Sequence, residues 1–258
     1  MIDIISVAIA GLTGQGIETA GEILSSSLNK LGYTHRAWRD FSTIIRGGHT
    51  LFELYISEKK DNPPPRMEKI DVAVVWDDVG AALYRKKISD EKLLFASMKA
   101  HSVRDENRED VPTLGYNVWS LGIISGYLGL PRHIIFEEVK RRFKRAENER
   151  LFLSGYERGC KVQRKHPLIG VKADHVILSG NDALSIGAIA GGVRHYYGYP
   201  ITPASEMLEK LMKWLPALGG NAYQVEDEIA AIHAAIGCSF AGMRTFVATS
   251  GPRIVSHD

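Results

Sequence analysis

The N-terminal part of the chain carries the feature that most limits its fold. An apolar run at residues 4–10 leads straight into the turn GLTGQG, and the apolar residues of the next stretch, IETAGEILSSSLNKLG, recur at helical spacing as far as Gly32. A continuous apolar run of this kind is typical of a strand that is buried on both faces of a parallel sheet. The order strand, glycine turn, helix therefore predicts an α/β fold.

The same alternation continues along the chain. We expect further strands in YTHRAW, IDVAVVW and KLLFAS, and a glycine turn between two β-prone runs in FSTIIRGGHTLFELYIS. The segments NVWSLGIISGYLGL and PRHIIFEEVKRRFKR predict helices, the second with Pro131 near its start. Together they indicate an α/β domain with a parallel sheet, which we place at residues 1–170.

A second unit follows a mixed, polar stretch at residues 151–172, which we interpret as a linker. We assign residues 171–258 to this unit, which reads as helix, strand, helix, helix and strand. A parallel sheet needs helices on both faces, and this stretch is short for that purpose. We therefore expect the second unit to be incomplete or to be completed by a partner.

Charge and cysteine content exclude several classes of function. The 32 basic and 30 acidic residues leave a formal net charge of +2, which gives no reason to expect nucleic acid or a membrane as a partner. The 2 cysteines, Cys160 and Cys238, are too scattered for a disulfide framework, a metal site or an iron–sulfur cluster. With neither signal peptide nor membrane-spanning run evident, we expect a cytoplasmic protein without a metal site of its own.

Gly11, Gly14 and Gly16 lie where the first strand passes into the first helix. Glycines at such a place let a ligand approach the backbone, and a helix N-terminus offers unpaired N–H groups to an anion. The order G-x-x-G-x-G differs from the dinucleotide fingerprint G-x-G-x-x-G, although Asp40 lies at about the spacing of a ribose-binding acid. An NAD(P) site and a simple tight turn thus both remain open.

The sequence IRGGH is a second candidate anion site. Arg46 and His49 flank Gly47 and Gly48, so a cation and an imidazole adjoin a turn with bare backbone. This combination could hold a phosphate or a carboxylate. The alternative is a glycine hairpin with a solvated arginine.

In the second unit, YPITP places Thr202 between two prolines. Pro203 suits the first position of a helix and Thr202 suits the N-cap. A cap does not explain Pro200, which stiffens the approach as well. We expect a fixed hydroxyl at a helix N-terminus, placed to meet a carboxylate or keto oxygen.

The run VEDEIAAIHAAIG places three acids, Glu226, Asp227 and Glu228, in the first turn of a predicted helix. Acids there stabilise a helix dipole by about 0.3–1 kcal/mol each, which is explanation enough for their presence. Glu228 directly precedes the apolar residues Ile229, Ile232, Ile236 and Phe240, and so we expect it to face inward. A partly buried carboxyl can share a proton with a ring nitrogen.

Three stretches resemble the 2-oxoacid:ferredoxin oxidoreductases: GLTGQGIETAGEIL…IIRGGHTLFEL, SGNDALSIGAIAGGVRHYYGYPITPASEMLE and VEDEIAAIHAAIGCSFAGMRTFVATSGP. The chain is most similar to subunits in which a gamma domain is fused in front of an alpha domain, as in enzymes for 2-oxoglutarate or a broad range of 2-oxoacids. The resemblance implies a Rossmann-like gamma domain and part of an alpha-type domain that binds the thiamine pyrimidine. YPITP is its most specific motif.

The resemblance also implies an activity. These enzymes decarboxylate a 2-oxoacid oxidatively on thiamine diphosphate, transfer the acyl group to coenzyme A and reduce ferredoxin through an iron–sulfur cluster. Thr202 would contact the 2-oxoacid, and Glu228 would hydrogen-bond N1′ of the thiamine aminopyrimidine. A separate beta subunit would hold the diphosphate, its magnesium ion and the cluster. The glycine turn and residues 46–49 would be anion-binding candidates for coenzyme A or would serve assembly.

One departure from the family pattern bears on activity. Family members continue beyond TSGP with another glycine and a long further stretch, whereas here RIVSHD follows. We therefore expect a C-terminally truncated subunit that is inactive alone. Two other functions stay open: an NAD(P)-binding oxidoreductase, and a non-catalytic interaction module that docks on a partner.

Overall fold

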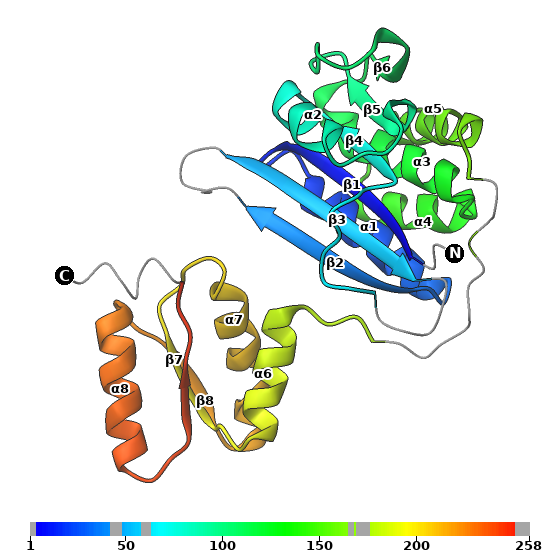
Figure 1. Ribbon diagram of the computed structural model, residues 1–258. Coiled ribbons are helices and arrows are strands. Elements are labelled where there is room, and N and C mark those ends of the chain that lie inside the picture. The colour runs from blue at the N-terminus through cyan, green and yellow to red at the C-terminus, as the bar shows by residue number, and fades with distance from the viewer. Residues whose placement is uncertain (1–3, 42–47, 58–62, 165–167, 169–175, 251–258) are drawn as a thin grey trace. The chain divides into compact units, whose positions relative to one another are not determined.

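The computed structural model describes residues 4–41, 48–57, 63–164, 168 and 176–250. Contacts between Cα atoms divide the chain into two compact units, Met1–Val176 and Ile177–Asp258. Each unit has its own sheet and its own hydrophobic core, and each is described by itself below (Figure 1).

The first unit is built on one twisted sheet with the strand order β2-β3-β1-β4-β5-β6. β1 pairs with β4 in parallel, and the parallel pairing continues through β5 and β6, while β3 runs antiparallel to both β1 and β2. In chain order the elements are β1 (Ile4–Leu12), α1 (Ile17–Lys30), β2 (Thr34–Phe41), β3 (His49–Ser57), β4 (Val72–Val75), α2 (Asp78–Arg85), β5 (Leu94–Ser97), β6 (Arg108–Glu109), α3 (Tyr116–Leu128), α4 (Arg132–Arg142) and α5 (Asn148–Lys161).

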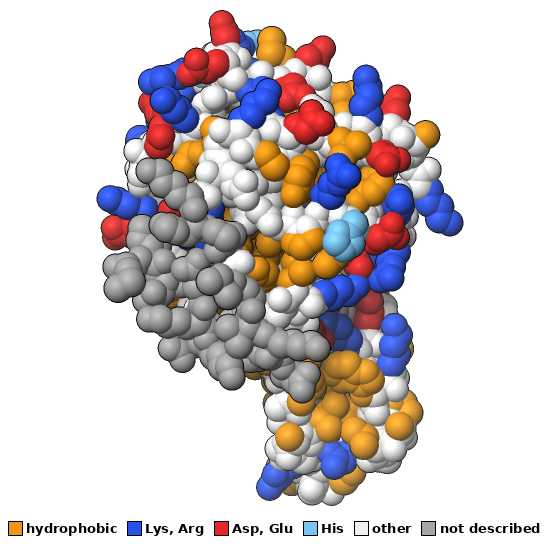
Figure 2. All heavy atoms as spheres, turned by 90° about the vertical axis from the view of Figure 1, so that its right-hand side faces the viewer, with side chains coloured by type: hydrophobic (Ala, Val, Ile, Leu, Met, Phe, Trp, Pro, Cys, Tyr) orange, Lys and Arg blue, Asp and Glu red, His pale blue; other side chains and the backbone are white. Residues whose placement is uncertain are grey.

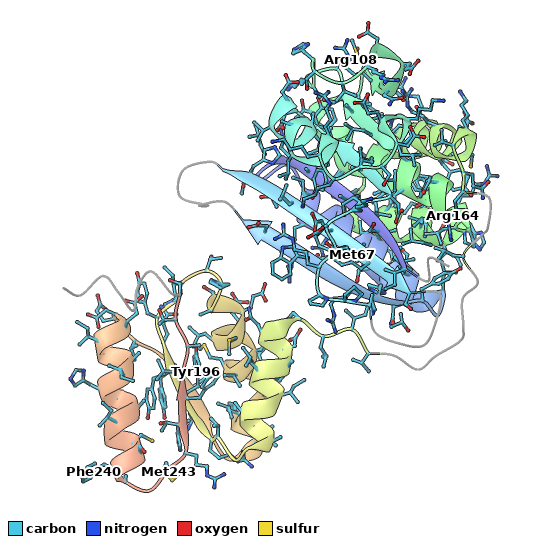
Figure 3. All side chains as sticks on the ribbon, in the orientation of Figure 1. Met67, Arg108, Arg164, Tyr196, Phe240 and Met243 are labelled. Carbon is cyan, nitrogen blue, oxygen red and sulfur yellow. The ribbon has the colours of Figure 1, made fainter. Side chains whose placement is uncertain are left out.

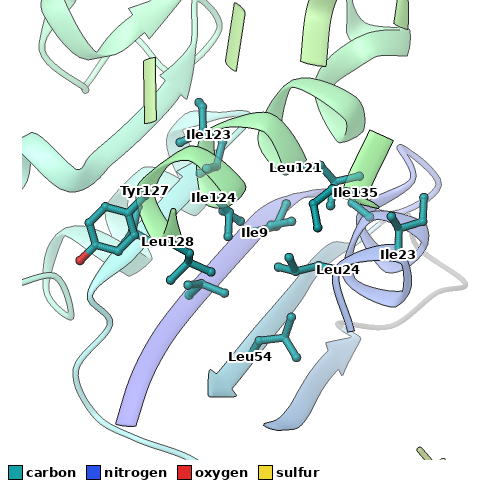
Figure 4. Packing of buried hydrophobic residues seen from close by; sticks show 14 of the residues in the cluster. Ile9, Ile23, Leu24, Leu54, Leu121, Ile123, Ile124, Tyr127, Leu128 and Ile135 are labelled. Atoms are coloured by element: carbon teal, nitrogen blue, oxygen red, sulfur yellow. The ribbon is translucent and has the colours of Figure 1, made fainter. Parts of the chain in front are cut away.

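The predicted α/β class is confirmed, and the hairpin β2–β3 adds antiparallel strands to the parallel part. β1 is apolar except for the buried Ser6, because the strand lies in the middle of the sheet. Ile5, Val7 and Ile9 pack with α1, α3, α4 and α5 on one face, and Ala8 and Ala10 pack with α2 on the other. The larger core, between β1 and α3, is shown in Figure 4.

The predicted linker at residues 151–172 is wrong in its first half, because residues 148–161 form helix α5. α5 lies against α3 with glycines from both helices at the contact. A Cβ built on Gly126 would lie 2.2 Å from the carbonyl oxygen of Tyr156, and one on Gly155 would lie 2.3 Å from that of Trp119. The two backbones thus touch, which is possible only without side chains at these positions.

A fully buried carboxylate lies on the α2 face of the sheet. Glu53 of β3 accepts hydrogen bonds from the hydroxyls of Tyr55 and Tyr84 and pairs with Lys87, whose Nζ is 3.0 Å from Oε1. Burial alone raises the pKa of Glu53, but these hydrogen bonds outweigh it and hold the pKa below its ordinary value. The same burial raises the pKa of Tyr84 far above its ordinary value, so its hydroxyl stays a donor.

The second unit is a three-stranded parallel sheet in the order β8-β7-β9. Its elements are α6 (Gly180–Ala190), β7 (His195–Gly198), α7 (Ser205–Trp214), β8 (Asn221–Gln224), α8 (Glu228–Phe240) and β9 (Thr245–Val247). The prediction from the sequence did not include β8, which is a short strand with a polar composition. The small core consists of Tyr196 at the centre of β7 and leucines from α7 and the turn after it (Figure 3).

Helix α8 is oriented differently from the expectation. Ile229, Ile232 and Ile236 are about half exposed and Phe240 is 94% exposed, whereas the buried residues of the helix are Ala231 and Ala235. The alanine face allows the helix to lie close to the strands. Figure 2 views the second unit from the side of α6, away from α8, and shows exposed apolar side chains there too. No helix in the described part of the chain is long and apolar enough to cross a membrane.

Candidate functional site

The glycine turn of the first unit forms at the carboxyl end of β1, as predicted. Gly14 and Gly16 have φ angles of 87° and 89°, in the left-handed region that favours glycine, and Gly16 is the N-cap of α1. Gly11 is still within β1, and a Cβ there would lie 2.7 Å from the Trp76 ring. Glycine is thus required at each position, either by the φ angle or by a close neighbour. The turn leads directly to the unpaired N–H groups at the start of α1.

The turn is linked to the second glycine motif through Thr13. Its backbone N–H and its hydroxyl both donate to the carbonyl of Gly48, at 3.0 and 2.7 Å, and its hydroxyl also lies 2.8 Å from that of Thr50. Gly48 and His49 therefore lie against the glycine turn. Arg46 and Gly47 are outside the described residues.

His49 is held by an aspartate that sequence reasoning missed. Nε2 of its ring donates to Oδ1 of Asp77 at 2.7 Å, and the same oxygen accepts the backbone N–H of Gly80 at 2.9 Å as the N-cap bond of α2. Burial alone raises the pKa of Asp77, but the bonds from His49 and Gly80 outweigh it, so the pKa lies below its ordinary value. Asp77 is thus a carboxylate that orients the imidazole.

A pocket of about 420 Å³ opens beside His49 on the α2 face. Apolar residues of β3 and α2 line it, and Asp40 and Lys86 add one charge of each sign. Asp40 is on β2, which β3 separates from β1. This arrangement differs from the dinucleotide fold, in which the acid ends the parallel strand next to the first strand, and it counts against the NAD(P) reading.

In the second unit, Thr202 and Glu228 follow the carboxyl ends of adjacent strands. β7 and β8 are parallel, Gly198 is in register with Gln224, and the N–H of Val225 donates to the carbonyl of Gly198 at 3.1 Å. The segments that lead from these strands to Thr202 and Glu228 thus leave the same edge of the sheet side by side. Ligands of open α/β sheets bind at this edge.

The expected N-cap role of Thr202 is wrong. Helix α7 begins at Ser205 with Ala204 as its N-cap, and Pro203 lies in the turn before it. That turn is closed by the N–H of Ser205, which donates to the carbonyl of Ile201 at 2.9 Å. Thr202 is exposed, and the peptide bond between Thr202 and Pro203 is cis. The hydroxyl of Thr202 therefore belongs to an exposed turn and does not cap α7.

Glu228 is the first residue of α8, and its neighbour Asp227 is the N-cap, with its carboxylate accepting the N–H of Ala230 at 2.7 Å. Glu226 and Asp227 are exposed, whereas Glu228 is half-buried and its Oε1 is buried. Asp227 therefore caps the helix, and α8 does not need Glu228 as its cap. Glu228 can still stabilise the helix dipole.

Two further groups of the second unit belong to this edge. Thr249 follows β9, and its buried hydroxyl has no hydrogen-bond partner within the described part of the chain. Asn181, from the first turn of α6, donates to the carbonyl of Pro203 at 2.9 Å. Sequence signals for both existed in the stretches TSGP and SGND, but no spacing rule connects them to Thr202. Among the described residues, no three His, Cys, Asp or Glu side chains come together as a metal site.

Two family models match the chain. The one described as "Pyruvate ferredoxin/flavodoxin oxidoreductase" matches residues 6–158, which is more than half of the chain. The one described as "Pyruvate flavodoxin/ferredoxin oxidoreductase, thiamine diP-bdg" matches residues 186–255, and so contains Thr202, Glu228 and Thr249.

Individual relatives agree with these matches. The alpha subunit of 2-oxoacid:ferredoxin oxidoreductase 1 of Aeropyrum pernix is 26% identical over 321 aligned residues, which cover 95% of this chain and 50% of that protein. The 2-oxoglutarate synthase subunit KorA of Methanocaldococcus jannaschii is 48% identical over 75 residues, or 29% of this chain and 20% of that protein. For the curated relatives whose alignment covers most of this chain, the chain spans only about half of the relative's length.

A solved structure agrees in fold. The 2-oxoglutarate:ferredoxin oxidoreductase from Magnetococcus marinus, with 2-oxoglutarate, coenzyme A and succinyl-CoA bound, gives a TM-score of 0.75 at 24% identity and covers 98% of this chain and 49% of that one. The fold of both units is therefore that of a known architecture. Since the first family model extends over more than half of its residues, the chain belongs to the pyruvate ferredoxin/flavodoxin oxidoreductase family.

Proposed function

We propose that this chain is part of a 2-oxoacid:ferredoxin oxidoreductase that converts a 2-oxoacid and coenzyme A to an acyl-CoA and passes the electrons to ferredoxin. Residues 1–170 supply a gamma-type domain, and residues 171–258 supply the first part of an alpha-type domain. The observation that carries the proposal is the shared sheet edge from which the segments bearing Thr202 and Glu228 leave. The names of the relatives, among them several 2-oxoglutarate synthase subunits, favour 2-oxoglutarate or a similar acid as substrate.

The residues at this edge fit thiamine diphosphate as the cofactor. A half-buried carboxyl at Glu228 suits a hydrogen bond to an aminopyrimidine nitrogen, and the hydroxyl of Thr249 is buried without a partner in the described residues. When bound, thiamine diphosphate supplies the electron sink that decarboxylation of a 2-oxoacid needs. On this chain, Glu228 would hold a proton at the pyrimidine, and Thr202 would orient the 2-oxoacid through its hydroxyl.

The glycine turn is the proposed anion site of the gamma-type domain. Gly11, Gly14 and Gly16 bring bare backbone to the start of α1, and Gly48 and His49 lie against them. This edge suits the phosphates of coenzyme A, and we include Arg46 and Gly47 in the proposed site only because they directly precede Gly48 in the sequence. We assign the diphosphate with its magnesium ion and the iron–sulfur cluster to a beta subunit. The 2 cysteines of this sequence are too few to ligate a cluster.

The test is co-expression of the chain with its beta partner and an assay of dye reduction that depends on both a 2-oxoacid and coenzyme A. We expect reduction by the complex, none by the chain alone, and a loss of at least about 100-fold in kcat for Glu228→Gln. The matched control is Glu226→Gln, an exposed acid two residues away, which should keep the activity. A complex that contains both chains, thiamine diphosphate and a cluster but reduces no dye with any 2-oxoacid would refute the proposal.

A further inference from the structure

The turn that carries Thr202 is held by a side chain from another helix. Nδ2 of Asn181 donates to the carbonyl of Pro203 at 2.9 Å and lies 3.2 Å from Oε2 of Glu206. The first of these acceptors is the backbone of the residue that directly follows Thr202, and the second is on the first turn of α7. One amide thus connects α6, the Thr202 turn and α7.

Asn181 comes from a well-defined point of the chain. Ser179 caps α6 and forms a capping box with Asp182: the hydroxyl of Ser179 accepts the N–H of Asp182 at 3.0 Å, and the Asp182 carboxylate accepts the N–H of Ser179 at 3.1 Å. The carbonyl of Asn181 accepts the hydroxyl of Ser185 at 2.8 Å. The backbone that carries the amide is therefore fixed on both sides.

We propose that Asn181 is a positioning residue for the substrate: its amide fixes the Pro203 carbonyl and thereby the direction of the Thr202 hydroxyl. This role rests on the function proposed above for Thr202. The backbone bond from Ser205 to Ile201 closes the turn locally, and the bond from Asn181 ties the closed turn to the rest of the unit. Without it, the turn keeps its shape but loses a fixed direction, which weakens binding of the ground state and leaves the chemistry itself unchanged.

General packing of α6 on α7 is the competing explanation, and the structure offers a control for it. The ammonium of Lys210 pairs with the carboxylate of Asp182, a second connection between the same two helices that does not involve the Thr202 turn. A Lys210→Met variant removes that connection and leaves the amide of Asn181 in place. Asn181→Leu keeps the side-chain size and removes the donor, while Asn181→Gln retains a donor on a longer arm.

The experiment uses the complex of the full chain with its beta partner, and compares KM for the 2-oxoacid, KM for coenzyme A and kcat. For Asn181→Leu we expect KM for the 2-oxoacid to rise about fivefold, the equivalent of one hydrogen bond, with KM for coenzyme A unchanged. Asn181→Gln should restore part of the loss, and Lys210→Met should leave KM for the 2-oxoacid within about twofold. An unchanged KM in Asn181→Leu, or an equal rise in Lys210→Met, overturns the inference.

Hydrogen exchange separates this inference from the proposed function. Backbone amides of residues 199–206 should exchange faster in Asn181→Leu than in the wild-type complex and in Lys210→Met. This readout needs no turnover, so a complex that is inactive with every 2-oxoacid refutes the proposed function but leaves the exchange result valid. Exchange in residues 199–206 that is equal in Asn181→Leu and wild type overturns the positioning role, whatever the activity.

Discussion

The contact between α3 and α5 allows a stability prediction to be worked out from distances. A Cβ on Gly126 would lie 2.2 Å from the carbonyl oxygen of Tyr156 and 2.9 Å from the backbone nitrogen of Cys160. Both are backbone atoms of a helix, so no side-chain rotation can relieve the overlap. Gly126→Ala must therefore move α3 and α5 apart by about 1.2 Å, the difference between 2.2 Å and an ordinary contact of 3.4 Å.

The expected cost follows from two opposing effects. Overpacking in a core costs about 1–3 kcal/mol, and the upper end applies where the backbone itself must shift and neighbouring contacts are lost along the interface. Alanine gains about 1 kcal/mol over glycine in helix propensity. We therefore expect Gly126→Ala to lower the free energy of unfolding of the first unit by about 2 kcal/mol.

Urea unfolding of the full chain, followed by tryptophan fluorescence, measures this change because Trp76 and Trp119 are buried in the first unit. At an m-value of about 2 kcal/mol/M, the midpoint should fall by about 1 M. The control is Gly187→Ala in α6, where a new Cβ meets nothing within 4 Å, so that the propensity gain alone should keep or raise the stability of the second unit. A midpoint for Gly126→Ala equal to or above that of the wild type would contradict the reasoning.

Three further predictions concern charges and ligands. Glu53→Gln should lower the free energy of unfolding by about 3 kcal/mol in urea titrations, because it leaves the ammonium of Lys87 facing a neutral buried partner. The pKa values of Glu53 and Asp77 in the folded protein are below their ordinary values, so both carboxylates stabilise the fold above their unfolded pKa values, and this stability is lost as the pH falls through their folded pKa values. We therefore expect the Tm to fall as the pH is lowered below about 5, and a Tm that is unchanged down to about pH 3 would contradict this. NADH should not bind, since Asp40 is separated from the glycine turn by β3; a saturable fluorescence titration would restore the NAD(P) reading.

The sequence indicated the strand–turn–helix order correctly because each signal is local. The apolar run before Gly11 is typical of a buried strand, and the change to helical spacing after Gly16 marked the start of α1 within a residue. Helix α5 was missed for a physical reason. Gly155 and Gly159, the residues that make its closest contacts, add nothing to an apolar pattern and lower helix propensity. The signal that could have found it is the matching pair Gly122 and Gly126 on α3, since small residues four apart on two helices allow backbones to touch.

The orientation of α8 shows the limit of periodicity. The helix carries two apolar faces, one of isoleucines and one of small residues, and the sequence cannot tell which of them meets the sheet. The structure buries Ala231 and Ala235. The hydrophobicity of the larger side chains favoured the other face, but the closeness of the helix to β7 and β9 favours alanine.

The two candidate sites share one relation between sequence and structure. In each unit, the sequence identified the residues proposed to meet a ligand: the glycines and His49 in the first, Thr202 and Glu228 in the second. It missed the residues that orient them, Asp77 through a 2.7 Å bond to the imidazole and Asn181 through a 2.9 Å bond to the Pro203 carbonyl. A ligand-binding group is recognisable by its own chemistry and local spacing, whereas an orienting group acts only because strand order and helix packing bring it there. Both orienting residues lie at the start of a helix, Asp77 as the N-cap of α2 and Asn181 in the first turn of α6, where the N-cap geometry already fixes the backbone. Helix starts are therefore the first place to look for further residues of this kind.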